Sequence, residues 1–213
     1  MNNIKRIVIV ANGNISRNDI SHIHKADVVI GVDCAAYWLI IHGIIPDVAF
    51  GDFDSVTKRE LSVIRKRSKK VIEFPPEKDA TDLELAIDHA ITEHPEHVLI
   101  LGALGTRLDH SFVAVQLLEK FIGSGISAVL RDEKNECALC DSKQILLKNN
   151  HYKYFSILPV TDEITVSITG CAYPLNRAKI YRGVSLGVSN EIVSQKVEIT
   201  IYKGIALIMR SRD

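Results

Sequence analysis

Aspartates that follow short apolar segments are the residues of this sequence best suited to chemistry. The segment "IPDVAFGDFDSV", residues 45–56, carries Asp52 and Asp54 directly after an apolar run. In an extended segment, residues two positions apart point to the same side, so both carboxylates could reach one ion. The larger set, all in the first half, is Asp33, Asp52, Asp54, Asp79, Asp82 and Asp109.

Each of these aspartates follows an apolar run that has the character of a buried strand. The segments after the carboxyl ends of parallel strands line one crevice, so we expect the carboxylates to converge there. Carboxylates held close repel one another unless a cation balances them, and hard oxygen ligands suit Mg²⁺. The predicted metal ligands are Asp52, Asp54, Asp79 and Asp82.

A single aspartate has simpler explanations. Asp82 lies at the second position of a capping-box signature that runs from Thr81 to Glu84, and Asp47 after Pro46 is typical of a turn. For one residue we would favour such an explanation, whereas the recurrence of the pattern favours a site.

A glycine-spaced turn supplies the opposite charge. The segment "GALGTRLDH", residues 102–110, brings Arg107, Asp109 and His110 after a predicted strand. Glycines let backbone N–H groups approach an anion, and a guanidinium binds phosphate through two parallel hydrogen bonds. Together with a magnesium site, this turn favours a nucleoside triphosphate. The sequence contains neither the P-loop motif nor the dinucleotide-binding glycine motif.

Strand and helix patterns alternate up to about residue 132. The predicted strands lie in "RIVIVANG", "ADVVIGVD", "VAFGDFD", "KKVIEFPPEKD", "HVLILGALG" and "ISAVLRDE". The predicted helices cover residues 34–42, a segment that begins at residues 81–84, and residues 111–121. Apolar runs without strict alternation suit parallel strands covered on both faces, so we expect a doubly wound, mostly parallel α/β domain over residues 1–140.

Short β-branched segments separated by turn residues dominate the rest of the chain. They are "YKYFSILPV", "EITVSITG", "KIYRGVSLGVSNEI", "QKVEITIYKG" and "IALIMR". No helical pattern intervenes, so residues 141–213 are predicted to form a small all-β sandwich domain.

Composition excludes several classes of function. The 213 residues carry 26 basic and 26 acidic side chains, which argues against binding nucleic acid or a membrane surface through bulk charge. No apolar run reaches membrane-spanning length. The four cysteines do not suggest a disulfide framework, so we expect a reducing cytoplasm. The pair Cys137 and Cys140 is interpreted as buried apolar residues, since no second pair completes a zinc site.

The motifs resemble those of the thiamine pyrophosphokinase family. That family carries Asp-Gly-Gly-Ala-Asn, Pro-Asp-x-x-x-Gly-Asp-Phe-Asp-Ser, Asp-x-Thr-Asp and a glycine-rich Arg-x-Asp-His turn. This sequence has "DCAAY" (33–37), "PDVAFGDFDS" (46–55), "KDATDLELA" (78–86) and "GALGTRLDH" (102–110), in that order. In the second half, "YPL" (173–175) and "GVSNE" (187–191) resemble motifs of the family's β domain.

The resemblance implies transfer of a pyrophosphoryl group from ATP to the hydroxyl of thiamine by a homodimer. It implies that Asp52, Asp54 and Asp82 are catalytic and orient Mg²⁺ and the phosphates, with Asp82 a candidate proton acceptor. The candidate ATP-binding residues are Asp33, Asp79, Thr81, Arg107, Asp109 and His110, and the candidate thiamine-binding residues are Ser189 and Asn190.

One departure and two alternatives remain. Cys34 and Ala35 replace the family's two glycines, and Tyr37 replaces its asparagine. A β-carbon at these positions restricts how closely a ligand approaches the backbone, so we expect a locally adjusted pocket. The alternatives are a diphosphokinase for another hydroxymethyl heterocycle, such as a pterin, and a non-catalytic sensor of nucleotide or thiamine.

Overall fold

The computed structural model describes residues 4–75, 77 and 79–213, which divide into two compact units. The first unit extends to Glu133, and the second is Lys134–Asp213. This division falls before the strand at residues 135–140, whereas the predicted domains, 1–140 and 141–213, meet after it.

The first unit contains a parallel sheet with the spatial order β6-β5-β1-β2-β3-β4. Its strands are β1 (Arg6–Val10), β2 (Val28–Val32), β3 (Val48–Gly51), β4 (Lys70–Glu73), β5 (His97–Leu101) and β6 (Ser127–Arg131). The chain proceeds outward from β1 to β4 and then returns to β5 on the other side of β1. The strand order therefore reverses between β1 and β5, which is where open α/β sheets bind ligands.

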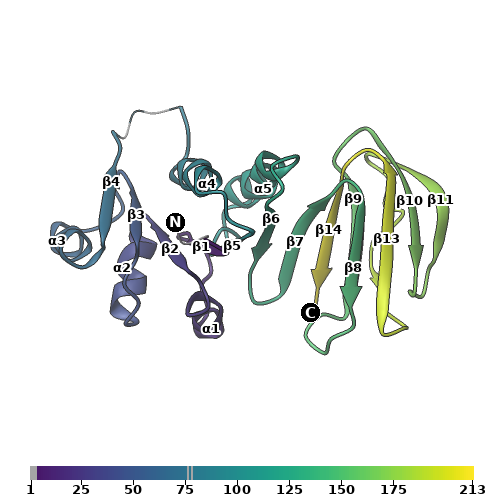
Figure 1. Cartoon of the computed structure of the whole chain (residues 1–213), viewed down its shortest axis with the longest axis horizontal. Coiled ribbons are helices and arrows are strands. Elements are labelled where there is room, and N and C mark those ends of the chain that lie inside the picture. The colour runs from purple at the N-terminus through teal and green to yellow at the C-terminus, as the bar shows by residue number, and fades with distance from the viewer. Residues whose placement is uncertain (1–3, 76, 78) are drawn as a thin grey trace. The chain divides into compact units, whose positions relative to one another are not determined.

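Helices cover both faces of this sheet. They are η1 (Arg17–Asp19), α1 (Ile20–Ile23), α2 (Cys34–Ile41), α3 (Lys58–Arg67), α4 (Asp82–Thr92), α5 (Leu108–Gln116) and η2 (Leu117–Phe121). Helices α1 and α2 lie on one side of the strands, and α4 and α5 lie on the other (Figure 1). Both faces of the central strands are buried, with residues 7–10 of β1 at 0% exposure, and the predicted doubly wound fold is confirmed.

Two helix starts differ from the sequence prediction. At α4, Thr81 Oγ1 accepts the backbone N–H of Glu84 at 3.2 Å, as expected, but the Glu84 carboxylate lies 2.9 Å from Lys120 Nζ. At α5, the helix begins at Leu108, before the predicted Ser111. The Ser111 hydroxyl lies 3.1 Å from the carbonyl oxygen of Arg107, which ties the preceding loop to the first turn.

The second unit is a sandwich of two antiparallel sheets. One has the order β12-β9-β14-β7 and the other the order β11-β10-β13-β8. The strands are β7 (Asn135–Cys140), β8 (Lys143–Leu147), β9 (Tyr154–Pro159), β10 (Glu163–Thr169), β11 (Leu175–Tyr181), β12 (Asn190–Glu191), β13 (Lys196–Lys203) and β14 (Ala206–Ser211). Alternate residues of both sheets, such as Phe155 and Val166, form its core. Cys137 and Cys140 are buried, in agreement with their interpretation as buried apolar residues.

One predicted strand is divided. Residues 179–192 were expected to form a single strand, but β11 ends at Tyr181 and β12 begins at Asn190. Gly183 and Gly187 have φ values of 85° and 99°, which extended strands do not accommodate. In the described part of the chain, no helix is both long and apolar enough to cross a membrane.

Candidate active site

A cavity of about 670 Å³ lies in the first unit, where the loops that follow β1, β2, β3 and β5 meet. These loops leave the carboxyl ends of the strands around the point where the strand order reverses. The predicted site residues that line the cavity are Asp33, Asp52, Asp54, Thr81, Asp82, Arg107, Asp109 and His110. The structure therefore brings together residues that are as far apart in sequence as Asp33 and His110.

Three carboxylates form the core of this site. One oxygen atom from each of Asp33, Asp52 and Asp54 lies within 4.8 Å of the others. Asp33 is buried, Asp52 is half-buried and Asp54 is exposed, so the group extends from the protein interior to the cavity mouth. Asp33 was predicted to contact the nucleotide, and this geometry also makes it a candidate metal ligand.

The turn between Asp52 and Asp54 is not extended, in contrast to the expectation. Phe53 has a φ of 55°, and its ring is buried in the core cluster formed by α2 and α3. The backbone N–H of Asp54 donates to Asp52 Oδ1 at 3.2 Å. Burial of the Phe53 ring thus fixes a tight turn, and this turn gathers the two carboxylates.

Asp33 is held by two donors on one oxygen. Asn12 Nδ2 donates to Asp33 Oδ2 at 2.9 Å, and the Ser55 hydroxyl donates to the same oxygen. The other oxygen, Oδ1, is buried and has no hydrogen-bond partner among the described residues. Burial raises the pKa of the Asp33 carboxyl, and the negative charges of Asp82 and Asp54 add to this increase.

Asp79 stands apart from this group. It is exposed, and the described part of the cavity wall includes Ala80, Thr81 and Asp82 but not Asp79. Its neighbour Lys78, part of the resemblance motif, lies outside the described residues.

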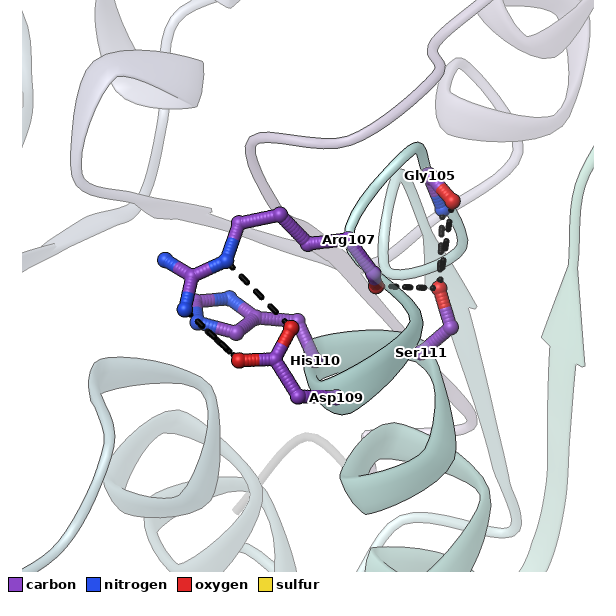
Figure 2. A network of polar contacts seen from close by, with 5 residues as sticks. All are labelled: Gly105, Arg107, Asp109, His110 and Ser111. Carbon is purple, nitrogen blue, oxygen red and sulfur yellow. Dashed lines mark hydrogen bonds and ion pairs between the residues drawn. The ribbon is translucent and has the colours of Figure 1, made fainter.

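The loop between β5 and α5 forms another wall of the cavity. Arg107 Nη2 donates to Asp109 Oδ2 at 2.7 Å, and Arg107 Nε donates to Oδ1 at 3.3 Å (Figure 2). This ion pair is exposed, and the hydrogen bond from Arg107 lowers the pKa of the Asp109 carboxyl. The Ser111 hydroxyl accepts the backbone N–H of Gly105 at 3.1 Å and so holds the loop against the helix. A guanidinium fixed at the cavity rim is suited to bind phosphate.

Glycines allow two loops of the site to lie in contact. Gly102 has a φ of 66°, and a β-carbon there would lie 2.2 Å from the carbonyl oxygen of Ala11. At Gly13, a β-carbon would lie 2.5 Å from the carbonyl oxygen of Gly102. The glycines thus permit the loop after β1 to pack on the loop after β5.

Sequence reasoning missed Asn12, Gly13 and Ser55 as parts of the site. Asn12 and Gly13 were interpreted only as the end of the first strand. Their position after a buried strand, like that of the aspartates, is the signal that could have identified them.

The two candidates of the second unit differ in exposure. Asn190 is buried, and its Oδ1 accepts the backbone N–H groups of Tyr173 and Glu191 at 3.0 and 2.9 Å. Its Nδ2 donates to the carbonyl oxygen of Tyr173 at 2.8 Å. Ser189 is exposed and has a φ of 57°. Asn190 therefore joins the segment around Tyr173 to β12.

Comparison with known proteins decides the family. A family model described as "Thiamin pyrophosphokinase, catalytic domain" matches residues 21–130. A second, described as "Thiamin pyrophosphokinase, vitamin B1 binding domain", matches residues 142–206. This chain belongs to the thiamine pyrophosphokinase family. The resemblance inferred from the motifs is thus confirmed.

Individual relatives agree along the whole chain. Thiamine pyrophosphokinase from Bacillus subtilis is 35% identical over 214 residues, which covers 99% of this chain and 100% of the relative. A crystal structure of thiamine pyrophosphokinase from Bacillus subtilis superposes with a TM-score of 0.90 at 35% identity, covering 98% of this chain and 100% of the other. For thiamin pyrophosphokinase from Geobacillus thermodenitrificans, the TM-score is 0.86 at 31% identity, with 98% of each chain covered.

Proposed function

We propose that the cavity of the first unit is the ATP site of a thiamine pyrophosphokinase. Membership of the family assigns the activity, which is transfer of the pyrophosphoryl group of ATP to the hydroxyl of thiamine, giving thiamine diphosphate and AMP. The observation that carries the choice of site is the group of carboxylates from Asp33, Asp52 and Asp54, which shares one cavity with the loops on either side of the reversal point.

The site suits a divalent cation, and we propose Mg²⁺. Asp33 Oδ1 is buried without a hydrogen-bond partner among the described residues, and two further carboxylates lie close by. Burial of like charges at this distance is costly without a cation, and carboxylate oxygens are the ligands that Mg²⁺ takes. Asp33, Asp52 and Asp54 would hold the ion, with Asp82 beside them. When bound, the ion neutralises charge on the phosphates.

The reaction requires that the hydroxyl oxygen of thiamine and the α,β-bridging oxygen of ATP lie on opposite sides of the β-phosphorus, in line with it. The oxygen of the thiamine hydroxyl attacks the β-phosphorus of ATP, and the bond from that phosphorus to the α,β-bridging oxygen breaks. AMP leaves with the bridging oxygen, and Asp82 accepts the hydroxyl proton. Arg107 exchanges its contact with Asp109 for a phosphate oxygen of ATP, while Thr81 and His110 line the nucleotide site. Most of the rate then comes from positioning and charge stabilisation.

We propose that the second unit binds thiamine near Ser189 and Asn190. Support comes from the match of residues 142–206 to a vitamin B1 binding domain. The Asn190 side chain is occupied by bonds to Tyr173 and Glu191, so it would shape the site by joining two segments. The exposed hydroxyl of Ser189 is the better candidate for contact with the vitamin.

The homodimer and the cytoplasmic location remain proposals. The segment between β11 and β12 exposes Val184, Leu186 and Val188 at 50, 47 and 47%, which supports an interface with a second copy. Sedimentation of the wild-type protein and of Leu186→Asp tests this, since a wild-type monomer would contradict it. All four cysteines are free thiols, which suits a reducing compartment.

Product analysis tests the proposed function. Incubation with ATP, Mg²⁺ and thiamine should release AMP and thiamine diphosphate in equal amounts, as measured by ³¹P NMR. Release of AMP only with a hydroxymethyl pterin would support the alternative diphosphokinase. Calorimetric binding of thiamine without AMP release would support the sensor.

A further inference from the structure

Asn12 connects the first strand to the acidic group of the cavity. It follows β1, and its side chain makes two hydrogen bonds to the segment after β2. Nδ2 donates to Asp33 Oδ2 at 2.9 Å, and Oδ1 accepts the backbone N–H of Ala35 at 2.7 Å. One side chain thus contacts both the buried aspartate and the helix that begins after it.

The second of these bonds replaces one that Asp33 would ordinarily make. Asp33 is the N-cap residue of α2, a position where aspartate usually accepts a backbone N–H of its own helix. Here its carboxylate makes no such bond, and its backbone has φ 51° and ψ −127°. The N–H of Ala35 is satisfied instead by Asn12, from the loop after β1. Because Asn12 caps α2, the carboxylate of Asp33 can face the cavity.

The first bond decides which oxygen of Asp33 is left without a donor. Asn12 and Ser55 both donate to Oδ2, so that oxygen is held from two sides. Asp33 is only 7% exposed, and its Oδ1 has no hydrogen-bond partner among the described residues. A buried carboxylate oxygen without a partner is unfavourable, and a bound cation would satisfy it. The two donors therefore fix the orientation of the Asp33 carboxylate.

The loop that carries Asn12 is itself fixed. The backbone N–H of the next residue, Gly13, donates to the carbonyl oxygen of Gly102, and that of Asn14 donates to the carbonyl oxygen of Leu104 at 3.0 Å. These bonds hold the loop after β1 against the loop after β5. The amide of Asn12 consequently extends from an anchored backbone.

We propose that Asn12 is a positioning residue for the pyrophosphoryl transfer. Its side chain caps α2 in place of Asp33 and thereby presents Asp33 Oδ1 to the catalytic cation. The inference rests on the proposed function, because it assumes that the acidic group binds a divalent ion. Ser55 acts on the same oxygen of Asp33 without contributing to the cap. A substitution of Ser55 therefore tests the orientation of Asp33 without removing the cap of the helix.

Mn²⁺ binding to the nucleotide-free protein tests the inference, with the ion followed by electron paramagnetic resonance. Asn12→Ala should weaken Mn²⁺ binding by roughly 10–100-fold, the range seen when a residue that orients a metal ligand is removed. It should also lower the melting temperature, because α2 loses its cap. Ser55→Ala should weaken Mn²⁺ binding with little change in melting temperature. Asn14→Ala is the matched control, since Asn14 contacts Leu104 through its backbone.

The possible outcomes separate the two proposals. If the wild-type protein binds no Mn²⁺, the cation assignment of the proposed function fails. If the wild type binds Mn²⁺ and Asn12→Ala binds it equally well but melts earlier, Asn12 is only a helix cap and the inference is overturned. Equal weakening in Asn14→Ala would also overturn it. Should Asn12→Ala not fold, unchanged Mn²⁺ binding in Ser55→Ala would contradict the orientation of Asp33 by its donors.

Discussion

Asp33 and Asp54 follow the adjacent strands β2 and β3, and a carboxylate oxygen of one lies within 4.8 Å of a carboxylate oxygen of the other. Asp33 is buried, whereas Asp54 is exposed at the cavity mouth. The protein thus places negative charges at the edge of the sheet where the proposed function also places the charges of ATP. This arrangement is favourable for catalysis only if a cation lies between the carboxylates and the phosphates.

Asp54→Asn should reduce turnover by roughly 10²–10³-fold, the size expected when one group that stabilises transition-state charge is lost. The amide has nearly the same shape and the position is exposed, so the melting temperature should change little. Asp88→Asn is a suitable control. Asp88 is an exposed carboxylate of α4 that pairs with Lys120 at 2.8 Å. Near-normal AMP release by Asp54→Asn would argue against Asp54 as a metal ligand.

Gly102→Ala should destabilise the first unit by about 2 kcal/mol or more, because its φ of 66° disfavours a side chain and the β-carbon would meet the Ala11 carbonyl oxygen at 2.2 Å. Gly105→Ala should be tolerated, since the nearest atom to its β-carbon would be Gly13 Cα at 3.6 Å. Chemical denaturation measures both. Equal stability of the two variants would show that the loops do not pack as described.

Arg107→Lys should lower kcat/KM for ATP by roughly tenfold to a hundredfold, because lysine cannot make the paired hydrogen bonds that a guanidinium makes to phosphate. The side chain is exposed and pairs with the equally exposed Asp109, so the fold should be unaffected. Arg59→Lys, on the exposed surface of α3, serves as the control. Steady-state kinetics with full activity in Arg107→Lys would exclude Arg107 as a phosphate ligand.

The free energy of unfolding should decrease as the pH is lowered from about 7.5 to about 5.5, partly because of His89. Burial lowers the pKa of His89, whose ring lies 5.1 Å from that of Phe50. When the pKa of a histidine is lower in the folded than in the unfolded state, its contribution to stability is complete above the pKa of the unfolded state. This contribution is lost as the pH falls through that pKa. His89→Gln should melt earlier at the higher pH, because it loses the ring contact, but should show a smaller decrease on acidification. Thermal melts at both pH values that give the same decrease in both proteins would contradict this assignment.

Local sequence patterns were sufficient to predict most of the fold. The alternation of apolar runs with helical patterns predicted the parallel sheet, because burial on both faces requires such runs. The β-branched segments after residue 143 likewise predicted the sandwich. The division of residues 179–192 was missed, since the positive φ of Gly183 and Gly187 depends on the turn that the surrounding strands impose.

The residues of the candidate site that carry charge were predictable from the sequence. The residues that act through a hydrogen bond to another side chain were harder to predict. Asp52, Asp54 and Arg107 stood out because charged residues follow apolar strands at the sheet edge. Asn12 and Ser55 did not, since each matters through a hydrogen bond to Asp33, a residue distant in sequence. Spacing alone also suggested that Asp79 joins the group, but the direction of the chain before α4 leaves it exposed.

Crystallography with Mn²⁺ and a non-hydrolysable ATP analogue tests the central claim most directly, because anomalous scattering locates the ion without ambiguity. The account predicts an anomalous peak within coordination distance of the carboxylates of Asp33, Asp52 or Asp54, with the triphosphate of the analogue in the same cavity. A peak elsewhere on the protein, or an analogue bound outside this cavity, would contradict it.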